Sequence, residues 1–571
     1  MAPLCIIAAL STLPYISIQV LAFQSCRFTP GDHGWPDPSA WAQLNSTVGG
    51  RLIATVPQAS ELGISSRVLT GALNTSENYP GEIMNPYFQN QSCDPFSPAS
   101  KPCQLGNYVS YSIAVTGADD VVAGIRFAKT KNVRLVIKNT GHDLLGKSTA
   151  RGGLGLWMHN LKTSKLMLDY KSSHYMGPAI KLGAGIRAYE AYETVHAAGY
   201  SVVGGDCPTI GITGGYTQGG GHSPLNGAYG MAADQVLEWE LVTADGSHLT
   251  ATPTSHNDLY WALSGGGPGT FAVVLSMTVK IHPEGPVGGA KLKFNGSSVT
   301  KSTYTKAMKS WWAALPDLVD TGATVIWSVS SAGFSLNILT ALNKTARQVE
   351  QMLNPFLHQL DDLVVPYDFT TTETASYYKH YNDTNGPLPY GVWPATTFFS
   401  GRLIPRAIVQ TDDGISSLTL AMDAIIEDES AGSWYYGCQA FNVRNISHPD
   451  NAVVSHWRDA IGFCLFISPW DWTVPWSEML ARKRHLGQVI YPAIEAATPG
   501  GGAYLNEVDP FVYPPGSSGW QKAFYGENYA KLRWIKDRWD PESVFYAYTA
   551  VGSEDWVTDD SGRLCRAGGV M

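Results

Sequence analysis

The chain is poor in charge: only 15% of its 571 residues are charged, and its formal net charge is −9. It has no basic face with which to hold a polyanion, so its composition disfavours nucleic acid and anionic membrane surfaces as partners. Apolar residues make up 44% of the chain, which is enough to bury a large core and excludes a disordered protein. After the first 22 residues, no run is long and apolar enough to span a bilayer.

The sequence also lacks any Cys-x-x-Cys pair, the spacing typical of zinc sites, and we expect no metal centre. Of its eight cysteines, Cys5 lies in the apolar N-terminal stretch and Cys207 in a glycine-rich loop, which leaves six. An even set of cysteines is typical of disulfides in an oxidising compartment. We expect Cys93 to pair with Cys103, because these two flank a Pro/Ser-rich loop. The spacing of the remaining four cysteines does not show how they pair. They are Cys26, Cys438, Cys464 and Cys565.

Residues 1–22 predict a signal peptide, because they are apolar from Leu4 onward and end in Val-Leu-Ala, a small-residue cleavage pattern. The usual basic start is missing, so an uncleaved N-terminal anchor is the alternative. Seven Asn-x-Ser/Thr sequons follow. Together these features predict a glycosylated protein that is secreted or resides in the lumen of the secretory pathway. The sequon asparagines are Asn45, Asn74, Asn90, Asn295, Asn343, Asn382 and Asn445.

Hydrophobic periodicity divides the mature chain into four regions. Residues 23–104 form a coil-like N-terminal arm, and residues 105–285 alternate strand and helix signals, as expected for a cofactor domain. Residues 286–500 carry no glycine-rich cofactor loop and predict a substrate domain, whereas residues 501–571 return to the first domain. We expect helices over 119–131, 187–198, 301–315, 345–360, 476–497 and 526–539. We expect strands over 108–115, 133–138, 179–184, 200–204, 236–244, 271–281, 324–329, 362–370 and 464–468.

Two glycine-rich turns carry the strongest chemical signal. One reads Asn-Thr-Gly-His-Asp over residues 139–143, and the other runs from Gly204 to Gly221 and contains Cys207. Glycines let the backbone approach a ligand closely, and successive amides form a concavity suited to a pyrophosphate. An imidazole from His142 and a thiol from Cys207 would hold a large planar cofactor from two sides. The pair therefore predicts a flavin, bound covalently at two points.

Each of these residues has a simpler interpretation when taken alone. His142 could be a turn histidine or a metal ligand beside Asp143, and Cys207 could be a buried thiol or half of a disulfide. The Gly219–Gly221 run could be a hairpin loop, and it does not fit the strand-to-helix context of a Rossmann fingerprint. Only the combination of the two turns predicts the flavin.

These motifs resemble the vanillyl-alcohol oxidase / p-cresol methylhydroxylase (PCMH) flavoproteins, and most closely their berberine-bridge-enzyme-like branch. Within that branch the chain is similar to secreted fungal isoamyl alcohol oxidase-like FAD-linked oxidoreductases. The resemblance implies an α+β fold with a PCMH-type two-subdomain FAD-binding domain and a C-terminal return segment. It also implies an α+β substrate domain, in which helices cover an antiparallel sheet. The matching blocks are 136–143, 205–211, the following Gly-Gly-x-x-x-Gly-Gly-Gly, 233–237, 261–267, 504–510 and 524–529.

The resemblance also implies residue roles for an FAD cofactor. His142 would bond the flavin methyl group through an imidazole nitrogen, Cys207 would bond the adjacent ring carbon, and the glycine loops would take the pyrophosphate. Two such bonds would raise the redox potential of the flavin and leave the face of its ring open to substrate. The expected cofactor-binding residues are His142, Cys207, Asn139, Thr140, Gly141, Asp143, Gly146, Gly211, Gly214, Gly215, Gly219, Gly220 and Gly221.

We expect an FAD-linked oxidoreductase that removes a hydride from an alcohol carbon and passes electrons to dioxygen, giving hydrogen peroxide. Tyr504 and Asn506 are the expected base and orienting group, whereas Glu507 and Asp509 are expected to cap the following turn. The expected partner is a small-molecule alcohol or phenolic substrate, and we expect a monomer. Core packing is the preferred interpretation of the aromatic residues Trp393, Tyr435 and Trp470, with cavity lining as the alternative.

Three positions and two alternative functions qualify this expectation. Tyr216 stands where many relatives have histidine, and His222 follows the triple glycine, where an aromatic residue is usual. Ile210 resembles the oxygen-access position, and its bulk leaves oxidase and dehydrogenase behaviour open. One alternative function is oxidative cyclisation or dearomatisation of a phenolic or polyketide intermediate. The other is a non-catalytic secreted glycoprotein, which would be expected to lose His142 and Cys207, yet both are present.

Overall fold

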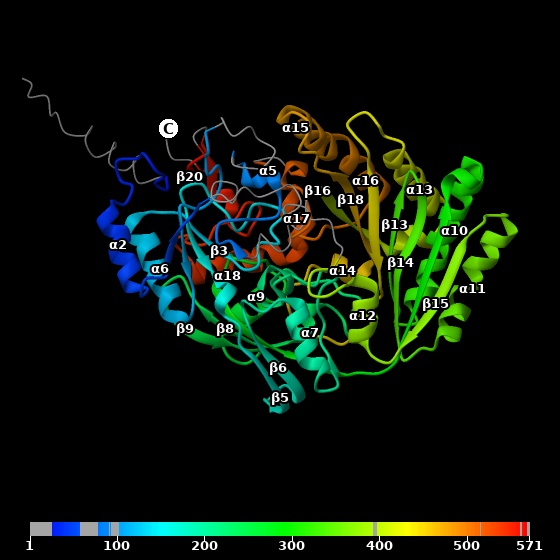
Figure 1. The fold of residues 1–571 in the computed structure, drawn as a ribbon, viewed down its shortest axis with the longest axis horizontal. Helices are drawn as coiled ribbons and strands as arrows, with labels where there is room; N and C mark the ends of the chain where they lie inside the picture. Colours follow the sequence, from blue (N-terminus) through cyan, green and yellow to red (C-terminus); the bar gives the residue numbers. More distant parts are fainter. Residues whose placement is uncertain are drawn as a thin grey trace, which may run out of the picture.

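The computed structural model describes residues 26–56, 78–90, 92, 102–391, 397–513, 516–559 and 562–567. The expected signal peptide (1–22), the sequon at Asn74, Trp393 and Cys93 of the expected Cys93–Cys103 pair lie outside the described residues. Two lobes lie side by side (Figure 1). The first holds the N-terminal half of the chain together with the C-terminal residues, and the second is built on one large sheet. The predicted α+β architecture is confirmed.

The first lobe begins with a small sheet in the order β1-β2-β4-β3, in which β2, β4 and β3 are parallel. α6 (Ala118–Lys131) makes the crossover from β2 to β3, two parallel strands that lie on either side of β4. Asp119 and Asp120 in its first turn complement the helix dipole. Asn132, in the left-handed conformation with φ 52°, ends the helix. The strands are β1 (Leu52–Ala54), β2 (Tyr111–Ala114), β3 (Leu135–Lys138) and β4 (Leu154–Trp157).

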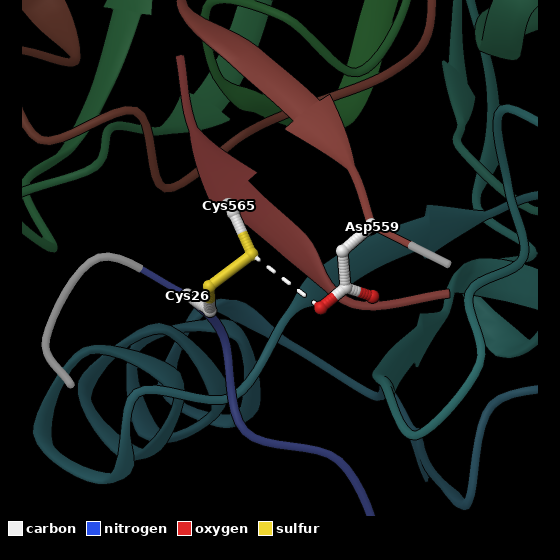
Figure 2. A group of neighbouring side chains, drawn as sticks. All are labelled: Cys26, Asp559 and Cys565. Carbon is white, nitrogen blue, oxygen red and sulfur yellow. Dashed lines mark hydrogen bonds between the residues drawn. A yellow bond between two sulfur atoms is a disulfide. The ribbon is translucent and has the colours of Figure 1, made fainter. Parts of the chain in front are cut away.

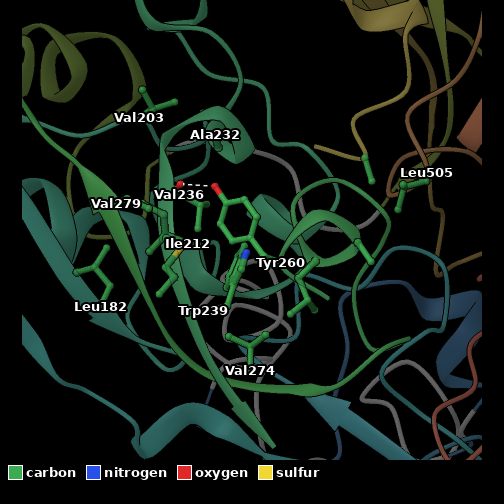
Figure 3. Close-up of a cluster of buried hydrophobic side chains, with 14 of the residues drawn as sticks. Leu182, Val203, Ile212, Ala232, Val236, Trp239, Tyr260, Val274, Val279 and Leu505 are labelled. Atoms are coloured by element: carbon green, nitrogen blue, oxygen red, sulfur yellow. Dashed lines mark hydrogen bonds between the residues drawn. The ribbon is translucent and has the colours of Figure 1, made fainter. Parts of the chain in front are cut away.

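A second, antiparallel sheet completes this lobe, in the order β5-β6-β10-β8-β9. α7 (Ala188–His196) and α9 (Asn257–Leu263) cover it, and Figure 3 shows the buried cluster around Trp239 and Tyr260. The Tyr260 hydroxyl donates to the Val236 carbonyl at 2.7 Å, so even this deep phenol is hydrogen-bonded. The strands are β5 (Ser164–Lys171), β6 (Met176–Gly183), β8 (Val236–Val242), β9 (His248–Ala251) and β10 (Val273–Lys280).

The second lobe is a seven-stranded antiparallel sheet in the order β15-β12-β14-β13-β17-β18-β16. α10 (Lys301–Val319), α11 (Ala346–Asp362) and α13 (Asp412–Ile426) pack on one face, with apolar residues of the sheet beneath them. The other face turns toward the first lobe (Figure 1). The strands are β12 (Val287–Asn295), β13 (Thr324–Ser330), β14 (Gly333–Leu342), β15 (Asp368–Thr374), β16 (Thr397–Pro405), β17 (Tyr435–Ala440) and β18 (Ala460–Pro469).

Some element boundaries differ from those predicted. The strand expected at 362–370 begins only at Asp368, because α11 continues to Asp362. The helix expected at 476–497 contains a π-helical turn, Leu486–Ile490, between α15 (Trp476–His485) and α16 (Tyr491–Ala497). The strand expected at 200–204 is reduced to β7 (Tyr200–Ser201), because the chain then enters the glycine loop of Cys207.

The C-terminal residues return to the first lobe and close on the N-terminal arm. α17 (Gly519–Tyr525) and α18 (Tyr529–Trp539) precede the hairpin of β19 (Trp556–Thr558) and β20 (Leu564–Arg566). A disulfide joins Cys26 to Cys565, 539 positions apart (Figure 2). Asp559 lies 3.9 Å from the Cys565 sulfur, but both sulfurs of this group are disulfide-bonded and are not thiolate ligands. Among the described residues, no helix has the length and apolar character needed to cross a membrane.

Candidate active site

A cavity of about 500 Å³ lies between the glycine turns of the first lobe and the open face of the large sheet. Side chains alternate along a strand, so every second residue of β17 and β18 reaches it. The residues between them, such as Tyr436 and Phe466, belong to the helix-covered core. The lining residues of these two strands include Tyr435, Gly437, Gln439, Phe463, Leu465 and Ile467.

Most of the predicted site residues line this one cavity. They are His142, Cys207, Asn139, Thr140, Gly141, Asp143, Gly211, Gly214, Gly215, Tyr504 and Asn506. Gly146 and Gly219–Gly221 are absent from the lining in the described part of the chain. A Cβ at Gly146 would lie 2.6 Å from the Phe88 ring, and one at Gly219 would collide with Asn506. The lack of a Cβ at Gly146 and Gly219 therefore leaves space for the side chains of Phe88 and Asn506.

His142 and Cys207 come together although they lie on separate loops. The imidazole Nε2 of His142 is 2.6 Å from the hydroxyl of Thr209, and the Cys207 sulfur is 3.7 Å from the same oxygen. Burial, aided by the charge of Lys138, lowers the pKa of His142 to about 3. The imidazole is therefore neutral at physiological pH and keeps a lone pair available for bonding.

Asn139 explains why two of the loop positions are glycine. A Cβ at Gly211 would collide with the Asn139 amide, and one at Gly214 would lie 2.6 Å from its Nδ2. Asn139 Nδ2 donates to the carbonyl of Ala184, whereas its buried Oδ1 has no partner among the described residues. Asp143 caps its own turn, accepting from the backbone amides of Leu145 at 3.0 Å and Ser148 at 2.6 Å. Asp143 therefore fixes the shape of the 139–143 turn, and Asn139 Oδ1 remains as a hydrogen-bond acceptor beside the cavity.

Tyr504 and Asn506 reach the cavity from the return segment. Asn506 Nδ2 donates to the Tyr504 hydroxyl at 2.9 Å and to the carbonyl of Gly215 at 2.8 Å. Lys147, from the first turn, donates to the carbonyl of Leu505 at 2.8 Å. Burial, reinforced by the charge of Glu507, raises the pKa of Tyr504 far above its usual value. Tyr504 is therefore a neutral phenol at rest, oriented by Asn506.

A charged cluster on the cavity wall was not predicted. His222 lies 3.3 Å from Glu507 Oε1 and 3.5 Å from Asp206 Oδ2, and its Nδ1 is 2.5 Å from the amide oxygen of Gln439. Burial alone would lower the pKa of His222, but Glu507 and Asp206 outweigh it and raise that pKa to about 10. The only signal in the sequence was that His222 replaces the usual aromatic residue.

The expectation that Glu507 caps the following turn was wrong, because its carboxylate binds His222. Asp509 does cap that turn, accepting from the amide of Phe511 at 2.8 Å, and it also binds Lys483. The two carboxylates look alike in sequence, but only one of them points into the cavity.

Ile210 lines the cavity three residues after Cys207. Tyr435 lines it as well, whereas Trp470 is buried against Phe398 at the edge of the large sheet. At the cavity wall, a disulfide joins Cys438 of β17, which is itself a lining residue, to Cys464 of β18. It fixes the two strands that present Gln439 and Phe463.

Two family models match the chain: an FAD binding domain over residues 109–252, and a berberine and berberine like domain over residues 503–552. The FAD-linked oxidoreductase orf1 of Neocamarosporium betae is 51% identical over 95% of each chain. The chain belongs to the VAO/BBE-type FAD-linked oxidoreductases. It is therefore an FAD-linked oxidoreductase, and the non-catalytic alternative is set aside.

Two further relatives extend this assignment. The bifunctional decalin synthase calF of Penicillium decumbens is 48% identical over 97% of each chain. The VAO-type flavoprotein oxidase VAO615 of Thermothelomyces thermophilus is 47% identical over 95% of this chain and 96% of that one. The crystal structure of MtVAO615 from Myceliophthora thermophila C1 has a TM-score of 0.89 at 46% identity and covers 95% of this chain and 100% of its own. That likeness confirms the PCMH-type fold with its antiparallel substrate sheet.

The residues of the cavity fit FAD. Asn139 Oδ1 is a buried acceptor whose hydrogen-bond donor is not supplied by the described protein residues. Gly269 has φ +63°, and a Cβ there would meet nothing within 4 Å, which leaves open space at the cavity wall. The glycine-rich turns let backbone amides approach phosphate groups closely. When bound, the flavin accepts a hydride from the substrate and gives electrons to the final acceptor.

Proposed function

We propose that the enzyme holds FAD through two covalent bonds, one to His142 and one to Cys207. The observation that carries this proposal is the meeting of the neutral imidazole and the thiol at the Thr209 hydroxyl. Because Nε2 of His142 is engaged with Thr209, Nδ1 is left to form the bond. The FAD of the glucooligosaccharide oxidase from Acremonium strictum is described as 6-S-cysteinyl, 8α-N1-histidyl. That enzyme is 18% identical to this chain, and its likeness shows the fold alone.

We propose that the enzyme oxidises an alcohol carbon of a small or secondary-metabolite substrate. With FAD bound to supply hydride uptake, Tyr504 would receive the proton of the substrate hydroxyl, and Asn506 would keep the phenol in place. Because Tyr504 is protonated at rest, its own proton leaves as the substrate proton arrives. Glu507 lines the same cavity and binds His222, whose ring lies 5.4 Å from that of Tyr504, and we assign its carboxylate as the acceptor of that proton.

We propose dioxygen as the electron acceptor, with hydrogen peroxide as the product. The relative VAO615 is named a flavoprotein oxidase, which supports this choice. A second candidate function is oxidative cyclisation of a phenolic or polyketide intermediate, favoured by the 48% identity to a decalin synthase. Both functions place a substrate against the same wall of the cavity.

An anaerobic substrate screen tests the reaction. Purified holoenzyme is mixed with alcohols, phenols and polyketides, and bleaching of the flavin absorbance near 450 nm, roughly the usual position for oxidised flavin, reports hydride removal. Adding air then shows whether the colour returns with stoichiometric hydrogen peroxide. Bleaching by alcohols and recovery in air support an alcohol oxidase. Bleaching confined to polyketides that emerge cyclised supports the second function.

We propose that the protein is secreted and glycosylated. The two described disulfides, Cys26–Cys565 and Cys438–Cys464, suit an oxidising compartment. Five of the sequon asparagines lie exposed: Asn90, Asn295, Asn343, Asn382 and Asn445. Intact-mass analysis of the native protein before and after deglycosylation tests this proposal. A mass that includes Met1 and carries no glycan would contradict it.

A further inference from the structure

Helix α12 (Tyr377–Asn385) of the second lobe lies against the loop that carries Cys207. The Tyr381 hydroxyl lies 2.9 Å from the carbonyl of Gly205 and 2.7 Å from the carbonyl of Asp206, and it donates to this pair. Asn385 Nδ2 donates to the carbonyl of Asp206 at 2.8 Å. Tyr381 is 0% and Asn385 1% exposed, so these bonds are shielded from water.

The same loop is held from the first lobe as well. Tyr192 of α7 donates to the carbonyl of Gly205 at 2.9 Å, and its ring meets that of Tyr381 edge-on at 4.7 Å. Beyond α12, Gly391 lies so close to Pro208 that a Cβ there would come within 3.0 Å of its ring. The two carbonyls before Cys207, and the proline after it, are therefore all fixed by neighbouring elements.

We propose that Tyr381 and Asn385 are positioning residues for flavin attachment, and that they aim the Cys207 sulfur at the flavin ring carbon. This inference rests on the proposed bond to Cys207. Bond formation depends steeply on the placement of the attacking atom, since a shift of about 1 Å costs on the order of a hundredfold in rate. A glycine-rich loop would not hold that placement by itself. Attachment at Cys207 thus depends directly on docking of the second lobe, whereas His142 lies on a loop of the first lobe and contacts the Cys207 loop through Thr209.

The attachment step balances with dioxygen as oxidant. The Cys207 thiol loses its proton and forms a sulfur–carbon bond, and the ring carbon loses its hydrogen as a proton. The two electrons released pass through the ring to dioxygen, which takes up two protons and becomes hydrogen peroxide. Nothing in this step requires Tyr381 or Asn385 to exchange a proton, because they act only through the loop backbone.

The experiment compares Tyr381→Phe and the double variant Tyr381→Phe/Asn385→Ala with Tyr377→Phe. Tyr377 lies one turn earlier on α12 and is also buried, at 2% exposed, but its hydroxyl makes no hydrogen bond to the Cys207 loop among the described residues. Peptide mass spectrometry of each purified holoenzyme measures the fraction of Cys207 and of His142 peptides that carry flavin. Thermal unfolding midpoints are recorded alongside.

We expect the double variant to lower the flavin-linked fraction of Cys207 by roughly tenfold, with the His142 fraction close to that of the wild type. Tyr381→Phe alone is isosteric and gives a smaller loss in the same direction, while Tyr377→Phe leaves both fractions unchanged. Full linkage of Cys207 in the double variant would overturn the proposal. The proposal would also be overturned if the flavin-linked fractions of Cys207 and His142 fell equally, in step with a lower thermal unfolding midpoint. A wild type with no flavin on Cys207 would sink the proposed two-bond attachment itself, and this inference with it.

Discussion

The imidazole of His142 is tied at Nε2 to the hydroxyl of Thr209, 2.6 Å away. Thr209 is fully buried and belongs to the loop of Cys207, so one hydroxyl links the two predicted flavin anchors. The contact also sets the chemistry of His142, because a neutral imidazole held at Nε2 presents Nδ1 to a ligand. The fold therefore brings the two proposed anchors together.

Flavin attachment gives the first prediction. Because two covalent bonds outlast unfolding, acid-precipitated wild-type protein should remain yellow. His142→Ala and Cys207→Ser should each retain flavin through the other bond, and the double variant should release all of it. Absorbance of the washed pellet measures the outcome. Complete release of FAD from the unfolded wild type would contradict the two-bond proposal.

Replacing the proposed base gives the second prediction. Tyr504→Phe removes the hydroxyl that receives the substrate proton, so the limiting rate of anaerobic flavin reduction should fall by roughly 10²–10⁴-fold. Tyr435→Phe, which also removes a hydroxyl from the cavity lining, is the matched control and should change that rate little. Stopped-flow absorbance at saturating substrate measures both variants. Equal rates in Tyr504→Phe and the wild type would show that another group takes the proton.

Access of dioxygen gives the third prediction. Ile210 lines the cavity beside Cys207, and Ile210→Val removes one methylene without changing charge or hydrogen bonding. We expect flavin reoxidation to become several-fold faster, while reduction by substrate stays the same. Mixing pre-reduced enzyme with aerated buffer measures reoxidation. If the two proteins reoxidise at one rate, Ile210 is not a gate, and if neither reoxidises, the acceptor is not dioxygen.

The buried charge of His222 gives the fourth prediction. Its pKa in the folded protein, about 10, lies above its ordinary value of 6.5. Its stabilising contribution is therefore complete below pH 6.5 and is lost as the pH rises through 10. His222→Gln leaves Asp206 and Glu507 without their cation, and we expect it to cost about 3–5 kcal/mol near neutral pH.

Urea unfolding at about pH 6 and about pH 10.5 tests the sign of this pH dependence. The difference in free energy of unfolding between the wild type and His222→Gln should be smaller at the higher pH. His248→Gln is the control, because its pair with Glu240 is half exposed and should contribute only about 0–1 kcal/mol. If the wild type exceeds His222→Gln in free energy of unfolding by the same amount at both pH values, His222 is neutral in the folded protein.

The meeting of His142 and Cys207 at one cavity was predictable because its signal is local. Glycine density around His142 and Cys207 marks loops that approach a ligand, whatever the rest of the chain does. The helices of the second lobe were predictable for a similar reason: α11 begins at a Thr345 cap whose partner, Gln348, is three residues away. Boundaries were less certain, as at β15, because where one element stops depends on what packs against it.

The sequence by itself determined the glycine-rich turns, the alternating order of the elements and the family. Each of these depends on residues close together along the chain. Only the tertiary structure decided that Glu507 joins His222 and Gln439 in the cavity wall, and that Cys26 pairs with Cys565 across 539 positions. It also decided that α12 of the second lobe holds the Cys207 loop through Tyr381. These relationships join residues that no spacing connects, because they arise only when distant segments of the chain fold against one another.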